Sequence, residues 1–498
     1  MKKAIVIGAG FSGLSAATYL AKNGWAVTVL EKHLIPGGRA RKLERNGFTF
    51  DMGPSWYWMP EVFEQYFNHF GKKVCDYYQL IRLDPSYKVY FSEENFNIPA
   101  GYEQLQQLFE SIEKGAAANL DKFLKEAEYK YFTGIHNLVH KPGLSLLEFA
   151  DAQVIKGIFK LDVFTHIKKH IAKYFTHPYL RSLLEFPVLF LGALPKNTPA
   201  LYSLMNYADI KLGTWYPQGG MYQVVNAMYK LAKDMGVQFY FNTEVKKINA
   251  PLKNEMPELI TVCNNHTKIF KADTIIGSAD YHHIDTELLG DKNRNYSNAY
   301  WNKRTLAPSC LLYFVGINKK LKHVVHHSLF FDTDFEKHGN EIYAAPSWPH
   351  NPLFYVSIPS VTDSSVAPKG CENLLFLVPV AAGLSGDDEA LRKRYFNKIL
   401  SPLEQITGNS IKNDIIFYQS YSVTDFANDY HAFKGNAYGL ANTLRQTAIL
   451  KPSIKSNKVK NLYFAGQLTV PGPGVPPCII SGKVVAKQII KDFGDTWQ

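Results

Sequence analysis

The stretch AIVIGAGFSGLSAATYLAKNGWAVTVLEKH, residues 4–33, decides the fold of this chain. Its apolar runs at 4–7 and 27–30 predict two strands, and the alanine-rich run between them predicts a helix. Gly8, Gly10 and Gly13 lie between the first strand and the helix with the spacing G-x-G-x-x-G. A strand, a glycine-rich turn, a helix and a second strand are typical of an α/β unit that binds a dinucleotide.

Each of the three positions in this turn requires glycine for a steric reason. The first permits a tight turn, the second lets a pyrophosphate approach the backbone, and the third lets the helix pack on the strand. The helix N-terminus favours phosphate by roughly 0.3–1 kcal/mol per charge. Glu31 ends the second strand, where its carboxylate can accept hydrogen bonds from ribose hydroxyls. The stretch predicts FAD or NAD, and the acid disfavours NADP.

Length and composition limit the architecture. A chain of 498 residues exceeds one ordinary core, so we expect two or three structural units. The five cysteines are scattered without metal-ligand spacing, which favours a reduced cytoplasmic protein without a metal site, each cysteine being a small buried apolar residue. No uncharged apolar stretch reaches the ~18 residues that span a bilayer, and glycines interrupt the apolar run that imitates a secretory signal.

The net charge of +11 is compatible with three interpretations: binding to nucleic acid, binding to an anionic membrane surface, or a contribution to solubility alone. Residues 154–175, VIKGIFKLDVFTHIKKHIAKYF, place apolar side chains at helical spacing and carry several lysines. Such a segment predicts a helix at a membrane interface, with a core-packed helix and a solvated lysine face as the alternative. Because the chain has no recognised nucleic-acid motif, we expect a membrane surface and no nucleic acid as partner.

Glycine-rich segments elsewhere distinguish between the two cofactors. PGGRA at 36–40 and FTFDMGP at 48–54 follow Glu31, and NLYFAGQ at 461–467 and VPGPGVPP at 470–477 precede an apolar helix. These stretches resemble the flavin-dependent amine oxidase and carotenoid desaturase superfamily. The resemblance implies FAD, with the G-G-R segment at its diphosphate and ribityl region and the C-terminal segment over the flavin ring.

Four further stretches narrow the resemblance to bacterial-type carotenoid (phytoene) desaturases. They are WYPQGGM at 215–221, GVQFYFNTEV at 236–245, ADTIIGSAD at 272–280 and VTDSSVAPKGC at 361–371. Val470 stands where relatives often have histidine, and Pro477 and Cys478 replace smaller residues. The resemblance implies that cofactor-binding residues are Gly8, Gly10, Gly13, Glu31, Gly37, Gly38, Arg39, Gly53, Val245, Gly466, Gln467, Gly474 and Val475.

The chemistry that the resemblance implies is the removal of two hydrogens from adjacent carbons beside a polyene. A hydride passes to the flavin and a proton leaves the neighbouring carbon, so the site needs an apolar channel and a modest base more than a nucleophile or a metal. Arg181 matches a position on the substrate side in relatives, and His177 stands where relatives have an acidic residue that this chain lacks. These two residues are the catalytic candidates, whereas we interpret Asp363 as a turn former.

The motifs also predict the domain organisation. Residues 1–75, 214–290 and 452–498 would meet as one discontinuous, Rossmann-like FAD-binding domain of α/β class. Residues 76–213 would form a helical substrate and membrane-contact region. Apolar runs at 311–317 and 374–380 predict strands, so residues 291–451 would add the sheet and helices of an α+β substrate domain.

The sequence therefore predicts a flavoprotein oxidoreductase of carotenoid biosynthesis, an FAD-dependent carotenoid desaturase that acts on CH–CH groups. The departures at Val470 and Pro477 favour a later acyclic intermediate, which could be hydroxylated, over phytoene. The expected location is cytoplasmic and peripheral to the membrane, and the electron acceptor could be oxygen or a quinone. The alternatives are another flavin oxidoreductase, such as an amine oxidase or protoporphyrinogen oxidase, and a flavin-free lipid-binding chaperone on the same fold.

Overall fold

The computed structural model describes residues 1–149, 162, 165–191, 194–249, 257–263, 266–408 and 410–498. The opening stretch folds as β1 (Lys3–Ile7), α1 (Phe11–Lys22) and β2 (Ala26–Leu30), which confirms the predicted strand–helix–strand order. Gly8 has a φ of +101°, a conformation that side chains with a Cβ rarely adopt. A Cβ on Gly13 would collide with the carbonyl oxygen of Gly8, so the helix can begin this close to the turn only with glycine there.

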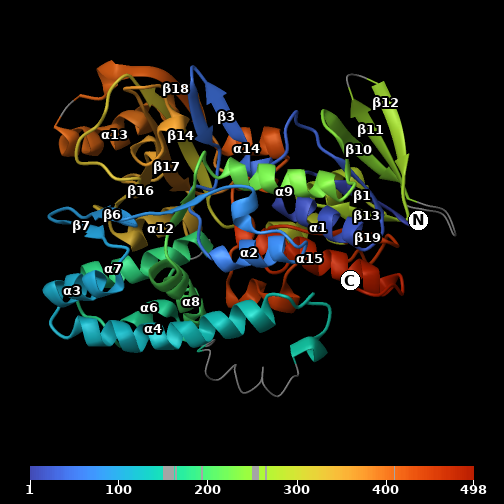
Figure 1. Ribbon diagram of the computed structural model, residues 1–498, viewed down its shortest axis with the longest axis horizontal. Helices are drawn as coiled ribbons and strands as arrows, with labels where there is room; N and C mark the ends of the chain where they lie inside the picture. The colour runs from blue at the N-terminus through green and yellow to red at the C-terminus, as the bar shows by residue number, and fades with distance from the viewer. Residues whose placement is uncertain (150–161, 163–164, 192–193, 250–256, 264–265, 409) are drawn as a thin grey trace.

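A five-stranded parallel sheet surrounds this unit, in the order β19 (Leu462–Phe464), β13 (Thr274–Gly277), β1, β2 and β9 (Gln238–Tyr240). Helices α9 (Tyr222–Asp234) and α15 (Val475–Asp492) pack against α1, and Figure 1 shows the three together beside the sheet. All five strands come from the three ranges that we assigned to the FAD-binding domain. The boundaries of those ranges stay a prediction.

A second, seven-stranded sheet lies beside the first, and all but one of its pairings are antiparallel. The predicted strands at 311–317 and 374–380 are its neighbours β14 and β17. Helix α13 (Glu389–Thr407) covers one face, where Phe396 and Leu400 are buried with the strands (Figure 1). The sheet order is β18 (Ile415–Tyr421), β14 (Ser309–Ile317), β17 (Glu372–Val380), β16 (Phe354–Ser357), β15 (His327–Phe330), β6 (Tyr87–Tyr90) and β7 (Asn95–Ile98).

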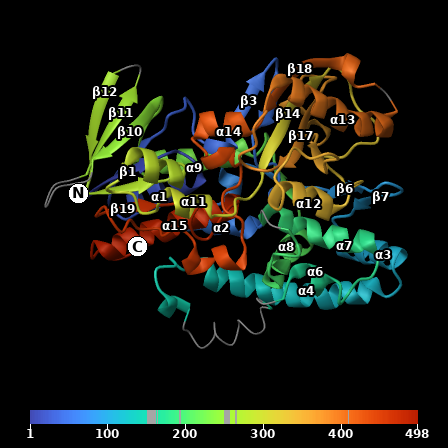
Figure 2. The ribbon, with the colours of Figure 1, turned by 180° about the vertical axis from the view of Figure 1, so that it is seen from behind.

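A group of helices lies beneath the second sheet in the views of Figures 1 and 2. Ile167, Ile171 and Phe175 are fully buried there, while Lys169 and Lys173 are exposed. For this end of the predicted amphipathic segment, the core-packed alternative therefore holds. Residues 154–161 and 163–164 of that segment lie outside the described residues. The helices are α3 (Tyr102–Ile112), α4 (Ala116–Thr133), α6 (Ile167–Ile171), α7 (Pro178–Glu185) and α8 (Leu204–Tyr207).

Smaller elements complete the fold. A three-stranded antiparallel sheet is formed by β10 (Thr243–Asn249), β11 (Glu258–Cys263) and β12 (His266–Lys271). β3 (Lys42–Arg45) and β4 (Phe48–Asp51) form an antiparallel hairpin. β5 (Leu80–Arg82) pairs antiparallel with β8 (Trp215–Pro217), which is distant in sequence. The other helices are α2 (Pro60–Asn68), α10 (Tyr281–His283), α11 (Asn298–Asn302), α12 (Phe335–Tyr343) and α14 (Val423–Tyr430).

Three expectations can be compared with this fold: the burial of the cysteines, the role of Asp363, and the length and apolarity of the helices. Cys310 and Cys371 are buried as expected, but Cys75 is exposed because it lies in a short surface turn, which corrects the expectation that every cysteine is buried. Asp363 accepts hydrogen bonds from the amides of Ser365 (2.9 Å) and Gly219 (2.6 Å), which confirms its role in a turn. Among the helices of the described residues, none is both long and apolar enough to cross a membrane.

Candidate active site

A large cavity extends from the glycine-rich turn of the first sheet to the inner face of the second sheet. All of the predicted cofactor-binding residues except Gly13 line it, namely Gly8, Gly10, Glu31, Gly37, Gly38, Arg39, Gly53, Val245, Gly466, Gln467, Gly474 and Val475. Gly13 instead contacts the Gly8 turn, the packing role predicted for the third glycine. Segments more than 400 residues apart in sequence therefore share one cavity.

Glu31 lies at the end of β2 with only 5% of its surface exposed. Its Oε2 accepts a hydrogen bond from the Ala9 amide (2.8 Å) and its Oε1 accepts one from the His33 amide (2.9 Å). Burial raises the pKa of Glu31, while these two amides and the nearby Arg41 oppose that rise. A carboxylate has about four lone-pair positions, so it can still accept hydrogen bonds from a ribose diol in the cavity.

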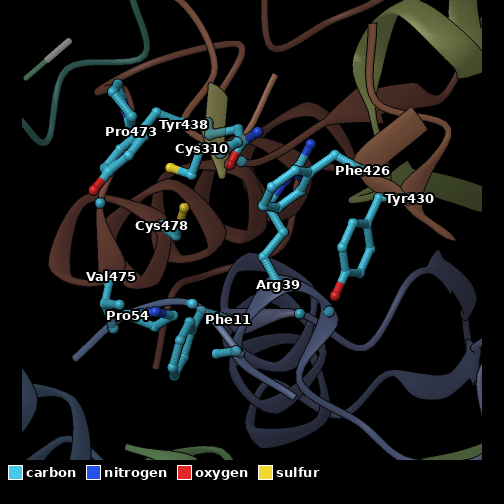
Figure 3. A pocket seen from close by; sticks show the side chains of 18 of the residues that line it. Phe11, Arg39, Pro54, Cys310, Phe426, Tyr430, Tyr438, Pro473, Val475 and Cys478 are labelled. Carbon is cyan, nitrogen blue, oxygen red and sulfur yellow. The ribbon is translucent and has the colours of Figure 1, made fainter. Parts of the chain in front are cut away.

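Arg39 is a cationic group of the cavity, and its guanidinium lies over the Tyr430 ring, 5.4 Å from the ring centroid (Figure 3). Its Nη2 lies 3.8 Å from Asp280 Oδ2. Its Nε is buried and has no hydrogen-bond partner among the described residues. The Gln467 amide is oriented so that its nitrogen donates to the Tyr438 carbonyl oxygen (3.2 Å). Its oxygen then accepts hydrogen bonds from Arg39 Nη1 (3.0 Å) and Nη2 (3.1 Å). A half-buried guanidinium whose buried Nε is an unused donor beside glycine backbone fits a diphosphate.

The glycines leave space that a cofactor can occupy. An added Cβ on Gly10 would meet no atom within 4 Å, so it would enter the cavity itself. A Cβ on Gly53 would collide with the carbonyl oxygen of Arg39, and Gly466 has a φ of +120°. The open cavity beside Gly10, the buried carboxylate of Glu31 and the Arg39 Nε without a hydrogen-bond partner together fit FAD, whereas Gly53 allows its own segment to pack on Arg39.

Comparison with known proteins gives the family. Residues 11–490 match the model of the family described as flavin containing amine oxidoreductase. The chain belongs to this family. This flavin-containing membership confirms the predicted superfamily and the predicted cofactor, FAD.

Two curated relatives of this amine oxidoreductase family member are carotenoid enzymes. The chain is 40% identical over 490 residues to the carotenoid 3,4-desaturase of Haloarcula japonica, with 98% of each chain covered. It is 32% identical to the 4,4'-diapophytoene desaturase (4,4'-diaponeurosporene-forming) of Staphylococcus aureus strain Newman, with 99% of each covered. Among solved structures, an oxidoreductase from Methanosarcina mazei shares the fold with a TM-score of 0.62 at 16% identity, covering 97% of this chain and 100% of that one.

The two predicted catalytic residues, His177 and Arg181, do not line the cavity. His177 forms the N-cap of α7, where its side chain accepts a hydrogen bond from the Tyr179 amide. Arg181 Nε donates to the carbonyl oxygen of Phe175 at 2.7 Å. The geometry gives no support to a catalytic role for either residue, because both side chains stabilise the start of α7 instead.

The part of the cavity beyond the cofactor residues was not predicted from motifs. The sheet and α12 contribute mostly apolar side chains, among them Leu329, Phe331, Leu353 and Leu377, as well as Phe186 from the helical region. The sequence signal here was the apolar runs at 311–317 and 374–380, which predict strands but do not say which face of the sheet meets a ligand.

Polar side chains interrupt this apolar wall at a few places. Tyr343, Tyr355 and Tyr438 line the cavity, and burial raises the pKa of each phenol, so all three are neutral at neutral pH. His338 also lines it, but Nδ1 accepts from the Leu353 amide (3.1 Å) and Nε2 donates to the Pro379 carbonyl (2.8 Å). Both ring nitrogens of His338 are thus occupied, which leaves it no free position for a substrate proton.

Proposed function

We propose that this chain is an FAD-dependent carotenoid desaturase of carotenoid biosynthesis, and that its substrate is a later acyclic intermediate with a hydroxylated end. The observation that carries the proposal is the single cavity that joins the cofactor-binding residues to a long apolar wall. The 40% identity to a carotenoid 3,4-desaturase over 98% of the chain supports the same reaction. An amine oxidase acting on a small cationic substrate would not need so extensive an apolar surface.

In this proposal the chain holds FAD with the residues that surround the first part of the cavity. Glu31 binds the ribose, the turn at Gly8 and Gly10 and the side chain of Arg39 bind the diphosphate, and the backbone near Val245 contacts the adenine. Gly466, Gln467, Gly474 and Val475 lie at the flavin ring. When bound, oxidised FAD supplies the hydride acceptor. The apolar wall holds the polyene in register and excludes water from the reacting carbons.

The phenols of Tyr343 and Tyr438 support the proposed hydroxylated substrate. A hydrocarbon end offers no partner to these two phenols of the cavity wall, whereas an alcohol can both donate to and accept from them. Leaving one partner of such a buried hydrogen bond unpaired costs roughly 1–3 kcal/mol, which is enough to discriminate between the two kinds of substrate end. Phytoene is the alternative substrate, and it would leave both phenols without a polar contact.

We extend the proposal to peripheral contact with the cytoplasmic membrane surface, where a long apolar substrate resides. Large apolar side chains are exposed on and after α4, at the lower edge of Figure 1. They are Tyr129 (43% exposed), Phe132 (44%), Leu144 (41%) and Leu147 (82%). With the net charge of +11, this surface suits anionic lipid. A Phe132→Ser, Leu147→Ser variant should sediment less with anionic vesicles than wild type, and equal sedimentation would contradict the proposal.

Purified holoenzyme incubated with single carotenoids tests the proposed reaction. We expect a red shift in the absorption of the extracted pigment with a hydroxylated acyclic carotenoid, because each new double bond lengthens the conjugation. The rate of desaturation in anaerobic assays with added quinone, compared with the rate in assays that contain oxygen, identifies the electron acceptor. Unchanged spectra with every carotenoid, together with peroxide release from amines, would favour an amine oxidase. Purified protein without flavin absorbance would favour the lipid-binding chaperone.

A further inference from the structure

A polar cluster of Ser55, Tyr355 and His327 adjoins the cavity wall, with Tyr355 and His327 buried and Ser55 half-buried. Tyr355 lies on β16 and His327 begins β15, its antiparallel neighbour. Tyr355 Oη is 2.7 Å from His327 Nδ1 and 3.0 Å from Ser55 Oγ. Ser55 and Tyr355 line the cavity, whereas His327 lies behind them. Ser55 follows Gly53 by two residues, so the cluster is next to the cofactor-binding part of the cavity.

His327 is held rigidly and without a charge partner. Its side chain is fully buried, and its ring stacks on Trp56 with centroids 4.3 Å apart and an interplanar angle of 12°. Its Nε2 has no hydrogen-bond partner among the described residues. A buried polar atom left without a hydrogen-bond partner destabilises the folded state, so an imidazole maintained in this arrangement is a candidate for a functional role.

We propose that Tyr355 accepts the proton that the substrate loses during desaturation and passes its own hydroxyl proton to His327 Nδ1. The inference rests on the proposed desaturase reaction. Two C–H bonds break and one carbon–carbon π bond forms, so the substrate is oxidised by two electrons. The hydride and its electron pair go to the oxidised flavin. The proton from the adjacent carbon goes to Tyr355 Oη while the Tyr355 proton moves to Nδ1, and it returns to water by the reverse path after the product leaves.

The hydrogen-bond directions permit this transfer. A phenol has one proton, so when Tyr355 donates to Ser55, Nδ1–H of His327 donates to the phenol oxygen. When Tyr355 donates to an unprotonated Nδ1 instead, Ser55 can donate to the phenol oxygen. The second arrangement is the reactive one, because proton gain at the phenol oxygen is then matched by proton loss to the imidazole.

A neutral phenol and imidazole suit this reaction better than a carboxylate. Burial lowers the pKa of His327 well below 6.5, so the resting pair carries no charge beside the apolar substrate. A buried carboxylate without a partner would be costly in the same wall. The low basicity is sufficient, because a proton next to a carbon chain that is losing a hydride is a far stronger acid than an imidazolium.

The first test compares Tyr355→Phe with Tyr90→Phe in the flavin-loaded enzyme. Tyr90 is a matched control: its phenol is buried on the other face of the same sheet, stacked on Phe330. Tyr355→Phe should lower kcat by about 10²-fold or more, within the usual range for general acid–base groups, with KM and flavin content unchanged. The isotope effect for deuterium at the proton-bearing carbon should rise. Less than about a threefold loss and an unchanged isotope effect would overturn the proposal.

The second test observes the imidazole itself and does not depend on turnover. In protein labelled with ¹⁵N-histidine, the resonances lost in a His327→Gln variant identify His327. We expect them to show a neutral ring between about pH 5 and 8, with an Nδ1 shift that changes in Tyr355→Phe and not in Tyr90→Phe. An Nδ1 shift that is the same in wild type and Tyr355→Phe would overturn the pairing. If the wild-type enzyme desaturates no carotenoid, the proposed function is wrong. The proton-transfer role of Tyr355 and His327 is then wrong as well, even if the NMR data show their hydrogen bond.

Discussion

Glu31 Oε2 accepts a hydrogen bond from the Ala9 amide across 2.8 Å, which joins the end of β2 to the turn after β1. The same carboxylate is thus both a structural acceptor and the proposed ribose-binding group. Its buried position at the carboxyl end of parallel strands is where open α/β sheets bind their ligands. This pairing links a local sequence motif to the geometry of the whole cofactor site.

Glu31→Gln should weaken FAD binding by about 10- to 100-fold, because hydrogen bonds to a charged acceptor are worth roughly 1.5–3 kcal/mol. The amide also places a donor among the Ala9 and His33 amides, which are themselves donors. Titration of the apoprotein by flavin fluorescence gives the dissociation constant. Glu44→Gln, at an exposed residue of β3, is the control and should bind FAD like wild type. Equal affinity in both variants would contradict the ribose-binding role.

Two glycines of the same turn should respond differently to substitution. Gly10→Leu should abolish FAD binding with little change in the melting temperature of the apoprotein, because its side chain enters the cavity. Gly13→Ala should lower the apoprotein melting temperature itself, because its Cβ collides with the Gly8 carbonyl oxygen. Calorimetry of the two apoproteins, with flavin absorbance of the loaded samples, separates these effects. Equal melting temperatures would show that Gly13 has no packing role.

The sequence predicted those parts of the fold and of the site whose residues lie close together along the chain. The glycine turn and Glu31 act within 30 residues, so their spacing alone indicated the first strands and a dinucleotide cofactor. The choice of FAD over NAD needed the resemblance carried by the later glycine-rich segments. Tyr355 and His327 meet only through the antiparallel register of β15 and β16, which no motif encodes. Arg181 was predicted from the resemblance to relatives, which does not say which way the side chain points in this chain. Its Nε donates to the Phe175 carbonyl oxygen instead, because packing decides which helix face meets the cavity.

Lys451 makes the stability of the protein depend on pH. Burial lowers the pKa of its ammonium from 10.5 to about 7, and its Nζ donates to Asn442 Oδ1 at 2.9 Å. Between these two pKa values the unfolded chain binds a proton that the folded chain does not. Stability should therefore rise with pH from about 7 toward 10.5, by at most about 1.4 kcal/mol per pH unit from this residue.

A Lys451→Met variant should lose that part of the pH dependence. Its side chain has a similar length and no charge, so the free energy of unfolding should increase most near pH 7. Urea unfolding at several pH values measures the slopes. Lys458→Met changes an exposed lysine and should leave the wild-type slope intact. Parallel profiles for wild type and Lys451→Met would mean that the ammonium is not buried as described.

Tyr343 and Tyr438 should determine the preference for a hydroxylated substrate. Each Phe variant removes one phenol oxygen from the cavity wall and leaves the ring in place, so apolar packing against the polyene is retained. The ratio of kcat/KM for a hydroxylated carotenoid to that for its unhydroxylated analogue should fall by about 5- to 150-fold, which corresponds to roughly 1–3 kcal/mol. Because the hydrocarbon makes no hydrogen bond, its own kcat/KM should change little. Tyr90→Phe should keep the wild-type ratio, and an unchanged ratio in both cavity variants would assign the preference to another part of the wall.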